Sequence, residues 1–454
     1  MPIETINPAT GQVVKTFEPH TPEEVNQKIE AAEQTFQSWK KVSFPERAKL
    51  MQRQADILEN EAETYGRIIS LEMGKPLKDA VAEVKKCAKV CHYYAENAAG
   101  FLQDETITTK ASRSLIAYEP LGVVLAVMPW NFPFWQVYRF LAPALMAGNV
   151  GLLKHSSNVP QCALAIEEIV RKAGFPENTF QPLLIGARAV DAVIAHPLVR
   201  AVTLTGSEAA GSKVAEKAGQ EIKKTVLELG GSDPFIVLED ADLEQAATIA
   251  VKSRMVNSGQ SCIAAKRFIV VEAIADAFLK RMKEIMGSLK TGDPLTEDCD
   301  YGPMARKDLA EELQQQVQDS LKKGAQVVLE GGRTDTESAY FKPMILKNVA
   351  PGMPAYDEEM FGPVAAVIVA KDEEDAIRIA NDSRFGLGGA VWTQDKDRGL
   401  RVARQVETGA MFVNTMVASS PEMPFGGIKK SGYGRELSYL GIREFVNQKS
   451  IWVE

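Results

Sequence analysis

The chain has 454 residues, of which 45% are hydrophobic and 25% are charged. This composition is ordinary for a globular protein, and the length exceeds what one hydrophobic core usually organises, so we expect two or more domains. A formal net charge of −8, without any Lys/Arg-rich tract, argues against a nucleic-acid partner. No uninterrupted apolar run reaches the roughly 18–20 residues of a membrane span, so we expect no membrane partner either.

The cysteines indicate the redox compartment. The sequence has five, an odd number and too few for a disulfide framework, at Cys87, Cys91, Cys162, Cys262 and Cys299. Free thiols are typical of a reducing cytoplasm, and the first residues lack the basic and then apolar profile of a signal peptide. We therefore expect a cytoplasmic protein. Cys87 and Cys91 lie one helical turn apart, but none of the four histidines is spaced as a partner pair, so we expect no metal site.

The first hundred residues are predicted to be a helical scaffold. Thr21-Pro-Glu-Glu24 is a capping box that opens an amphipathic run to about residue 41, and Ser43-Phe-Pro-Glu46 repeats the signature for a second helix. Helical periodicity then continues to about residue 100, with a break near Gly74-Lys-Pro76. Nothing in this region predicts chemistry.

Two β-leaning segments lie far apart in the chain, at Thr106–Tyr118 and Glu444–Val453. Neither has an obvious hairpin turn of its own. We expect these segments to pair with each other or with another subunit.

From residue 121 the pattern changes to strands alternating with helices. Four apolar runs are predicted to be buried strands, at 122–128, 150–153, 180–185 and 199–204. Such alternation forms right-handed βαβ units and a doubly wound sheet. Ligands of these sheets bind beyond the carboxyl ends of the strands, which is where Asn131, Lys154 and Thr205-Gly-Ser207 fall. A second α/β region follows, with helices predicted at 240–254, 274–289 and 309–323 and strands at 268–271 and 326–329.

The segment from Gly206 to Lys213 is close to a phosphate-binding loop. Lysine and serine are exchanged relative to the nucleoside triphosphatase motif, which argues against that class of enzyme. A glycine turn that leads into a helix N-terminus can still bind a pyrophosphate. An ordinary turn after a strand is the alternative.

Two further residues are candidates for chemistry. Glu228 lies between two leucines, where a carboxylate fits a solvated face poorly, so we expect a raised pKa and a part in proton transfer. A glutamate on the outer face of a strand is the alternative. Cys262 follows Asn257-Ser-Gly-Gln-Ser261, a small and polar stretch that leaves a thiol reachable. It is either a nucleophile or an inert structural thiol.

These residues belong to a set of motifs that runs along the chain: Pro129-Trp-Asn-Phe-Pro133, Lys154, Thr205-Gly-Ser207, Leu227-Glu-Leu-Gly-Gly231, Gly259-Gln-Ser-Cys262, Glu359-Met-Phe-Gly-Pro363 and Pro424-Phe-Gly-Gly427. The set resembles the aldehyde dehydrogenase superfamily, in its order and over almost the whole chain. Within the superfamily the chain is similar to the bacterial succinate-semialdehyde dehydrogenases.

The resemblance implies an α/β fold of the aldehyde dehydrogenase type. A doubly wound, Rossmann-type cofactor-binding domain would take residues 1–101 and 120–228, and an α/β catalytic domain residues 229–428. A β oligomerisation arm and C-terminal strand would take residues 102–119 and 440–454. The resemblance also implies a homodimer or homotetramer.

The resemblance implies the catalytic roles as well. Cys262 would attack the aldehyde carbon as a thiolate, while the Asn131 amide and the Cys262 N–H hold the oxyanion. After hydride transfer to a nicotinamide, Glu228 would activate the water that hydrolyses the thioester. The residues expected to bind the cofactor are Trp130, Asn131, Lys154, His155, Ser156, Ser157, Gly206, Ser207, Leu229, Glu359 and Phe361.

One departure from the family pattern predicts the cofactor. NAD-preferring relatives commonly carry a glutamate three residues after the cofactor lysine, and that position is Ser157. A carboxylate would repel a 2′-phosphate, whereas serine can donate to it and Lys154 can neutralise it. We expect NADP to be preferred, with NAD as the second cofactor.

The substrate is predicted from Arg139, eight residues after Asn131, where succinate-semialdehyde dehydrogenases resemble one another in carrying an arginine. Its guanidinium would pair with the far carboxylate of the semialdehyde, with a salt bridge inside the protein as the alternative. The other expected substrate-binding residues are Ser419, Phe132, Trp135 and Phe425. Glutarate semialdehyde, a neutral aliphatic aldehyde and a non-catalytic homologue remain the alternatives. A CoA-acylating relative is disfavoured, because such proteins often lack the glutamate equivalent to Glu228.

Overall fold

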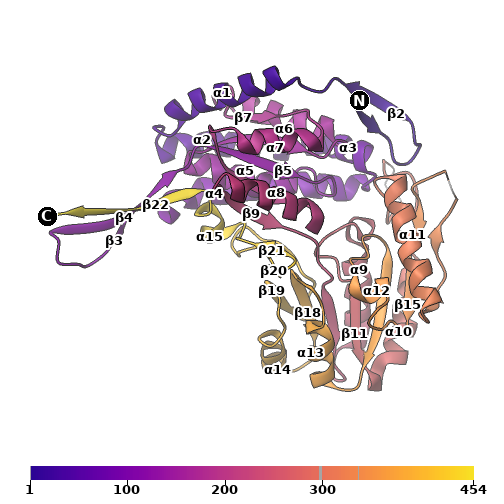
Figure 1. The fold of residues 1–454 in the computed structure, drawn as a ribbon. Helices are drawn as coiled ribbons and strands as arrows, with labels where there is room; N and C mark the ends of the chain where they lie inside the picture. The colour runs from indigo at the N-terminus through magenta and orange to yellow at the C-terminus, as the bar shows by residue number, and fades with distance from the viewer. Residues whose placement is uncertain (1, 296–298, 336) are drawn as a thin grey trace.

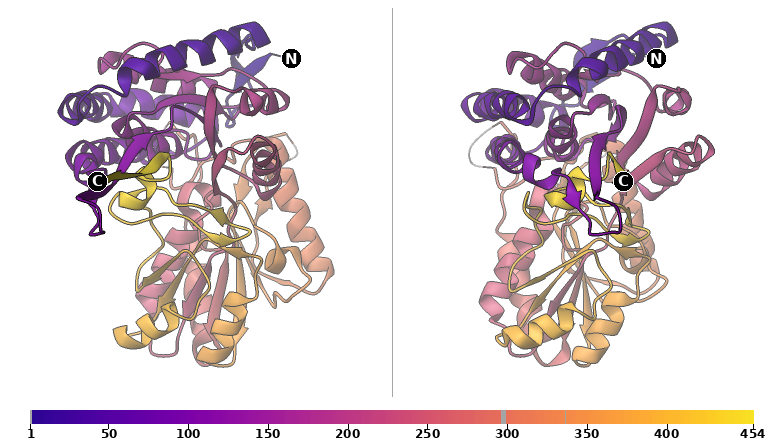
Figure 2. Two further views of the ribbon diagram at one scale, coloured as in Figure 1. Left: turned by 60° about the vertical axis from the view of Figure 1, so that its left-hand side comes forward. Right: turned by 90° about the vertical axis from the view of Figure 1, so that its left-hand side faces the viewer.

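The computed structural model describes residues 2–295, 299–335 and 337–454. Two α/β bodies are stacked on each other, and a narrow β arm extends sideways from the upper body (Figure 1). Figure 2 shows that the C-terminal residues, in yellow, return from the lower body to lie against the upper one. No helix within the described ranges has both the length and the apolar character needed to cross a membrane.

The upper body begins with the predicted helical scaffold. A hairpin of β1 (Ile3–Ile6) and β2 (Val13–Phe17) is followed by α1 (Pro22–Trp39), α2 (Phe44–Asn60), α3 (Ala62–Met73) and α4 (Leu77–Phe101). Both predicted capping boxes are present, because the side chains of Thr21 and Glu24, and those of Ser43 and Glu46, each bond the other residue's backbone. Gly74 ends α3 with φ 78, a left-handed conformation that suits glycine.

A six-stranded sheet forms the centre of the upper body, in the order β21-β9-β8-β5-β6-β7. Its five parallel strands confirm the predicted doubly wound sheet, and β21 adds an antiparallel edge. The strands are β5 (Val123–Met128), β6 (Val150–His155), β7 (Phe180–Pro182), β8 (Val199–Thr205), β9 (Lys224–Glu228) and β21 (Gly432–Tyr433). The helices between them are α5 (Trp135–Ala147), α6 (Pro160–Lys172), α7 (Val190–Ala195) and α8 (Glu208–Gln220).

This strand order creates a ligand crevice. The chain runs from β5 outward to β6 and β7 on one side, and then to β8 and β9 on the other. The switch point therefore lies between the carboxyl ends of β5 and β8, where open α/β sheets bind ligands. The predicted strand 180–185 is shorter than expected, because after Pro182 the Ile185 N–H donates to the Leu183 carbonyl in a tight turn.

The lower body is organised around a seven-stranded sheet, in the order β12-β15-β16-β11-β10-β18-β19. Its pairs are parallel except for β12 with β15. The strands are β10 (Pro234–Val237), β11 (Arg267–Val271), β12 (Gln326–Leu329), β15 (Met344–Lys347), β16 (Val364–Ala370), β18 (Gly388–Trp392) and β19 (Ala410–Val413). The covering helices are α9 (Leu243–Met255), α10 (Glu272–Gly287), α11 (Lys307–Lys322), α12 (Pro354–Asp357), α13 (Glu373–Asn381) and α14 (Lys396–Ala403).

Small elements connect these layers. They are the 3-10 turns Ala187–Ala189 and Val256–Gly259, the strands β13 (Gly332–Arg333), β14 (Phe341–Lys342), β17 (Phe385–Gly386) and β20 (Ile428–Lys429), and the helix α15 (Ser438–Ile442).

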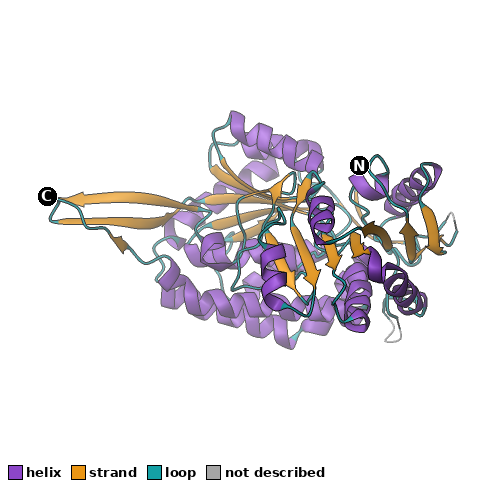
Figure 3. Cartoon of the chain, turned by 90° about the horizontal axis from the view of Figure 1, so that it is seen from below, coloured by secondary structure: helices purple, strands orange, loops and turns teal. Residues whose placement is uncertain are grey.

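The arm is built from segments that are distant in sequence. β22 (Val446–Val453) pairs antiparallel with β4 (Arg113–Pro120), in register from Val446 with Pro120 to Val453 with Arg113. β3 (Glu105–Thr106) lies on the other edge of β4. The long β4 and β22 arrows leave the body together (Figure 3). The predicted pairing of the two β-leaning segments is confirmed.

Candidate active site

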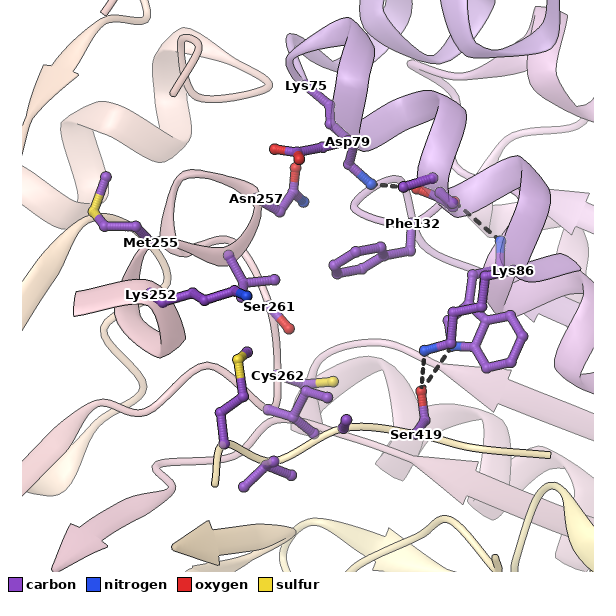
Figure 4. A pocket seen from close by; sticks show the side chains of 18 of the residues that line it. Lys75, Asp79, Lys86, Phe132, Lys252, Met255, Asn257, Ser261, Cys262 and Ser419 are labelled. Atoms are coloured by element: carbon purple, nitrogen blue, oxygen red, sulfur yellow. Dashed lines mark hydrogen bonds and ion pairs between the residues drawn. The ribbon is translucent and has the colours of Figure 1, made fainter. Parts of the chain in front are cut away.

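Two cavities meet at Cys262, which lines both of them. One, of about 650 Å³, lies among α4, α5, α9 and the loop around Ser419. The other, of about 750 Å³, lies at the carboxyl ends of β5 and β8 and faces residues 358–361. Figure 4 shows the first cavity, with Cys262 and Ser419 on its wall. A reacting atom at this thiol is therefore accessible from two separate spaces.

The loop before Cys262 has an unusual backbone. Asn257 and Ser258 both have φ 54, and Gly259 follows with φ 77. Three successive left-handed residues reverse the chain sharply, and such conformations persist only where the surroundings hold them. A Cβ at Gly259 would overlap the backbone of Gly362, so only glycine fits there. This turn follows the end of α9 and places Cys262 where the two cavities meet.

Buried cations hold the loop in place. The Lys266 ammonium donates to the carbonyl oxygens of Ser261 at 2.8 Å and Cys262 at 2.7 Å. The Arg254 guanidinium donates to the Gly259 carbonyl at 2.6 Å. Because hydrogen bonds from charged donors are stronger than neutral ones, these contacts stabilise the loop conformation that presents Cys262.

The Asn131 side chain is oriented as an oxyanion donor. Its Oδ1 accepts from the Gln136 side-chain amide at 3.0 Å, which directs the Asn131 NH₂ group toward the cysteine loop, where it donates to the Gln260 carbonyl at 3.0 Å. A second N–H of that NH₂ group remains. Within the described ranges the Cys262 backbone N–H has no partner. Two donors are thus available on residues that share the wall of the second cavity with the thiol, as an oxyanion hole requires.

The protein environment keeps the resting thiol neutral. Burial raises the pKa of Cys262 to about 12, while the charges of Arg139 and Lys266 act in the opposite direction. A thiolate is the nucleophilic form of cysteine, so attack requires loss of this proton.

Glu228 ends β9 and is enclosed. Neither carboxylate oxygen has a hydrogen-bond partner among the described residues, and the side chain lines neither cavity. Burial, followed by the charge of Glu436, raises the pKa of Glu228 well above its ordinary value, whereas Arg139 and Arg435 lower it. The raised pKa was predicted, and its cause is desolvation.

Seven of the expected cofactor residues line the second cavity. Its wall includes Ser207, which caps α8 by accepting from the Ala210 N–H at 3.3 Å, and Phe361, whose ring is edge-on to Trp130 at 5.8 Å. Glu359 accepts from the Gly231 N–H at 3.1 Å. The seven are Trp130, Asn131, Gly206, Ser207, Leu229, Glu359 and Phe361.

The other four expected cofactor residues, 154–157, lie at and just beyond the end of β6, outside the lining of this cavity. The His155 ring lies between two carbonyl oxygens, that of Pro133 at 2.9 Å from Nε2 and that of Met128 at 3.2 Å from Nδ1, and the Ser156 N–H also contacts Nδ1. Burial lowers the pKa of His155 to about 4, which keeps the ring neutral. Lys154 is buried and Ser157 is exposed. Their part in cofactor binding stays a prediction.

All five expected substrate-binding residues line the first cavity: Phe132, Trp135, Arg139, Ser419 and Phe425. Arg139, however, already has a partner. Its Nε lies 2.7 Å from the Glu436 carboxylate, both side chains are buried, and its guanidinium stacks 4.5 Å from the Phe425 ring centroid. The internal salt bridge left open from the sequence is thus present.

Sequence reasoning missed the contribution of α4. Lys75, just before this helix, forms a buried ion pair with Glu83, whose other oxygen accepts from the N–H groups of Phe134 and Trp135 at the start of α5. Lys86, one turn after Glu83, also lines the first cavity. A usable signal was the presence of charges on a helix face that also carries apolar residues.

The second cavity has missed residues too. Arg384 and Lys430 line it and both lie near Glu208, at 3.7 and 3.5 Å. The sequence around Arg384 and Lys430 contains no pattern that predicts a position in this cavity. Over the parts of the chain that the structure describes, no group of three or more His, Cys, Asp or Glu side chains is arranged to hold a metal.

Comparison with known proteins gives consistent likenesses. A profile described as "Aldehyde dehydrogenase family" matches residues 1–451. The chain is 53% identical over 453 residues to the "Probable succinate-semialdehyde dehydrogenase" for NADP(+) of Synechocystis sp., with 100% of both chains covered. It is 50% identical over 456 residues to succinate-semialdehyde dehydrogenase 1 for NADP(+) of Mycobacterium tuberculosis, again with 100% of both covered. The crystal structure of succinic semialdehyde dehydrogenase from Streptococcus pyogenes in complex with NADP+ is similar at TM-score 0.97 and 38% identity, covering 99% of each chain.

Proposed function

The chain belongs to the aldehyde dehydrogenase family, and on this premise we propose that it oxidises succinate semialdehyde to succinate, with NADP as the preferred cofactor and NAD as the second. The single observation that carries the proposal is the meeting of two cavities at one cysteine. One space can hold the aldehyde and the other its oxidant. The names of the full-length relatives support the choice of substrate and cofactor.

The residues present fit a nicotinamide dinucleotide. The second cavity lies at the switch point of a doubly wound sheet, and it includes Ser207 at the N-terminus of α8, where backbone N–H groups favour a phosphate. Trp130 and Phe361 offer apolar faces beside Cys262. When bound, the cofactor accepts a hydride from the substrate carbon.

The chain's own residues perform the other steps. The Cys262 thiol gives its proton to solvent water, and the resulting thiolate attacks the aldehyde carbon and forms a C–S bond, while the carbonyl oxygen takes up the electron pair and becomes an oxyanion. The Asn131 amide and the Cys262 N–H donate to that oxygen, and Gln136 keeps the amide in the donating orientation. Loss of hydride leaves a thioester on Cys262.

Hydrolysis of the thioester needs a base. Glu228 is the carboxylate we assign to it, and its raised pKa means that it binds a proton readily. Because the side chain lines neither cavity in this structure, it has to turn toward Cys262 before it can act. Contact with water there reverses the desolvation, so the carboxyl gives up its own proton to solvent and can then take one from the attacking water. Water then adds to the thioester carbon, the C–S bond breaks, and the acid leaves.

The cofactor preference is supported by Ser157 and Lys154. Ser157 is exposed at the end of β6 and carries no charge, so the 2′-phosphate of NADP meets no carboxylate from this residue. Burial lowers the pKa of Lys154, and a nearby phosphate would favour its charged form.

The proposal is tested by steady-state kinetics of the purified protein with three aldehydes, each with NADP and NAD. Succinate semialdehyde should have the highest kcat/KM, glutarate semialdehyde a lower one and butanal, which lacks a carboxylate, the lowest. Succinate should appear in step with NADPH, and C262A should form neither. The ion pair between Arg139 and Glu436 favours a neutral aldehyde as the second candidate, and a higher kcat/KM for butanal would establish it in place of ours.

We also propose a homodimer or homotetramer. The arm extends from the body, β22 pairs only with β4 among the described strands, and Trp452 at its end is 61% exposed. An open strand edge with an exposed aromatic residue is the kind of surface that proteins usually cover. Sedimentation velocity would distinguish these assemblies from a monomer. The five free thiols support a reducing, cytoplasmic location.

A further inference from the structure

Lys266 is a buried cation that lies against the cysteine loop. It directly precedes β11, only 1% of its side chain is exposed, and it lines neither cavity. Its ammonium donates to the backbone carbonyls of Ser261 at 2.8 Å and Cys262 at 2.7 Å, and it lies 3.3 Å from the Glu359 carboxylate. These three acceptors match the three N–H donors of an ammonium. Lys266 is therefore fully paired, and each of its partners lines one of the two cavities or both.

The two carbonyl groups that Lys266 holds belong to the peptide units on either side of the Cys262 Cα. Because a peptide unit is planar, the backbone of a residue has only two soft dihedral angles, one toward each neighbouring unit. Fixing both units therefore fixes the direction in which the Cys262 side chain leaves the backbone. The thiol lies on the cavity wall in that direction (Figure 4).

The Ser261–Cys262 peptide unit also carries an expected oxyanion donor. In a trans peptide the carbonyl and the N–H point in opposite directions. The Ser261 carbonyl accepts from Lys266 and, at 3.2 Å, from the Ala264 N–H. The Cys262 N–H of the same unit therefore points away from Lys266, and within the described ranges it has no partner. It belongs to a residue that lines both cavities, and Asn131, the other expected donor, lines the second.

Arg254 is another buried cation on this loop, but it acts on a different peptide unit. Its guanidinium donates to the Gly259 carbonyl at 2.6 Å. The N–H of that unit belongs to Gln260 and donates to the Asn257 carbonyl at 2.9 Å, so it stays within the loop. Arg254 thus holds the loop together without a hydrogen bond to either peptide unit next to Cys262.

We propose that Lys266 is a positioning residue for the reaction, which directs the Cys262 N–H toward the substrate oxyanion and sets the direction of the thiol. Gln136 has the matching role for the Asn131 amide. The two donors of the oxyanion hole are then held by separate supports, one on α5 and one next to β11. Donors that are held in advance need no reorganisation when charge develops on the substrate oxygen. The inference rests on the proposed reaction at Cys262, but not on the choice of aldehyde.

The charge of Lys266 acts on the thiol in the same sense. It lowers the pKa of Cys262, against the larger effect of burial. Burial lowers the pKa of Lys266 itself, whereas the charges of Glu359 and Asp233 raise it and so favour the ammonium form. Loss of this cation should therefore make the thiolate harder to form, in addition to releasing the peptide unit.

The test compares two reactions of the same thiol. Alkylation by iodoacetamide needs the thiolate, which displaces iodide, but it forms no oxyanion, whereas oxidation of an aldehyde needs both the thiolate and the oxyanion hole. The second-order rate constant of alkylation and kcat/KM for the aldehyde are measured at one pH, with the preferred cofactor present. C262A gives the background from the other thiols. The ratio of the two values separates the oxyanion hole from the access and ionisation of the thiol.

In K266M both values should fall, but kcat/KM should fall by about tenfold to a hundredfold more than alkylation, because full loss of one oxyanion donor costs about 10²- to 10³-fold. R254M removes a buried cation from the same loop and should lower both values by the same factor. K266Q keeps a donor without the charge, so its extra loss should lie between those of K266M and the wild type. K266Q takes the place of K266M if that variant does not fold.

The inference is wrong if the Lys266 variant lowers the two values by the same factor or changes neither. It is also wrong if R254M has the same extra loss of kcat/KM, because any damage to the loop would then disturb the donor. A failure of the proposed function is distinguishable. If the wild type oxidises butanal in preference to succinate semialdehyde, the proposed substrate is wrong and the same comparison is made with butanal. If it oxidises neither aldehyde, both proposals fail.

Discussion

The two cavities that meet at Cys262 are built in different ways. The second cavity, which we propose holds the cofactor, is formed by the carboxyl ends of neighbouring parallel strands, the start of α8, one face of α11 and short loops, so its position follows from the sheet. The first cavity, which we propose holds the substrate, is formed by side chains of four helices and a distant loop, joined by ion pairs and hydrogen bonds. The residues of the second cavity can be recognised from short motifs in the sequence. The charges of the first cavity depend on ion pairs between residues that are distant in the sequence.

Substitution of Glu228 should have the largest effect on the reaction rate. It should also separate hydride loss from the later hydrolysis of the thioester. In E228Q the steady-state rate should fall by about 10²- to 10⁴-fold through loss of the base. The first burst of NADPH should remain, because attack by Cys262 and hydride loss precede hydrolysis. Stopped-flow absorbance measures both phases. A burst that disappears together with turnover would place Glu228 in the first half of the reaction instead.

The ion pair between Arg139 and Glu436, beside the first cavity, is expected to stabilise the folded protein. R139A leaves the Glu436 carboxylate buried and unpaired, so the free energy of unfolding should fall by about 3–5 kcal/mol. Urea denaturation measures it, and adding E436Q should recover part of the loss. The control is K78A, whose pair with Asp300 is about half exposed and should contribute only about 0–1 kcal/mol. If R139A is as stable as the wild type and has lost only its preference for acidic aldehydes, Arg139 binds the distal carboxylate of the substrate directly.

The proposed preference for NADP can be tested by adding one negative charge at residue 157. S157E places a carboxylate where a 2′-phosphate is expected, so the ratio of kcat/KM for NADP to that for NAD should fall by about tenfold to a hundredfold. S157A removes the hydroxyl without adding charge and should lower the ratio less. Kinetics with saturating aldehyde give both values. An unchanged ratio in S157E would mean that the 2′-phosphate lies elsewhere, for instance near Arg384 and Lys430 on the wall of the second cavity.

Much of the fold could be predicted because its signals are local. The capping boxes at Thr21 and Ser43 start α1 and α2, and the apolar runs 122–128 and 199–204 are β5 and β8. Strand ends were less predictable, as at Pro182, where a turn replaces the expected continuation. The raised pKa of Glu228 followed from its two leucine neighbours, although the contribution of Glu436 did not.

The substrate side could not be predicted in the same way. Arg139 was expected to be free for a ligand, because no sequence pattern connects it with Glu436 almost three hundred residues later. The region before residue 101 was expected to be scaffold only, yet it brings Lys75 and Lys86 to the cavity. Their roles depend on contacts with α5 and with the loop at Ser419.

By itself the sequence determined the strand and helix alternation and the β character of the two arm segments, because these depend on residues close together in the chain and on simple periodicity. The interpretation of Cys262 as the nucleophile came from the resemblance to the family. Only the tertiary structure decided which cations are paired and where Glu228 rests. The physical reason is that the energy of a buried charge is set by its distance to other charges and to water. Those distances exist only once the two bodies and the C-terminal segment have packed together.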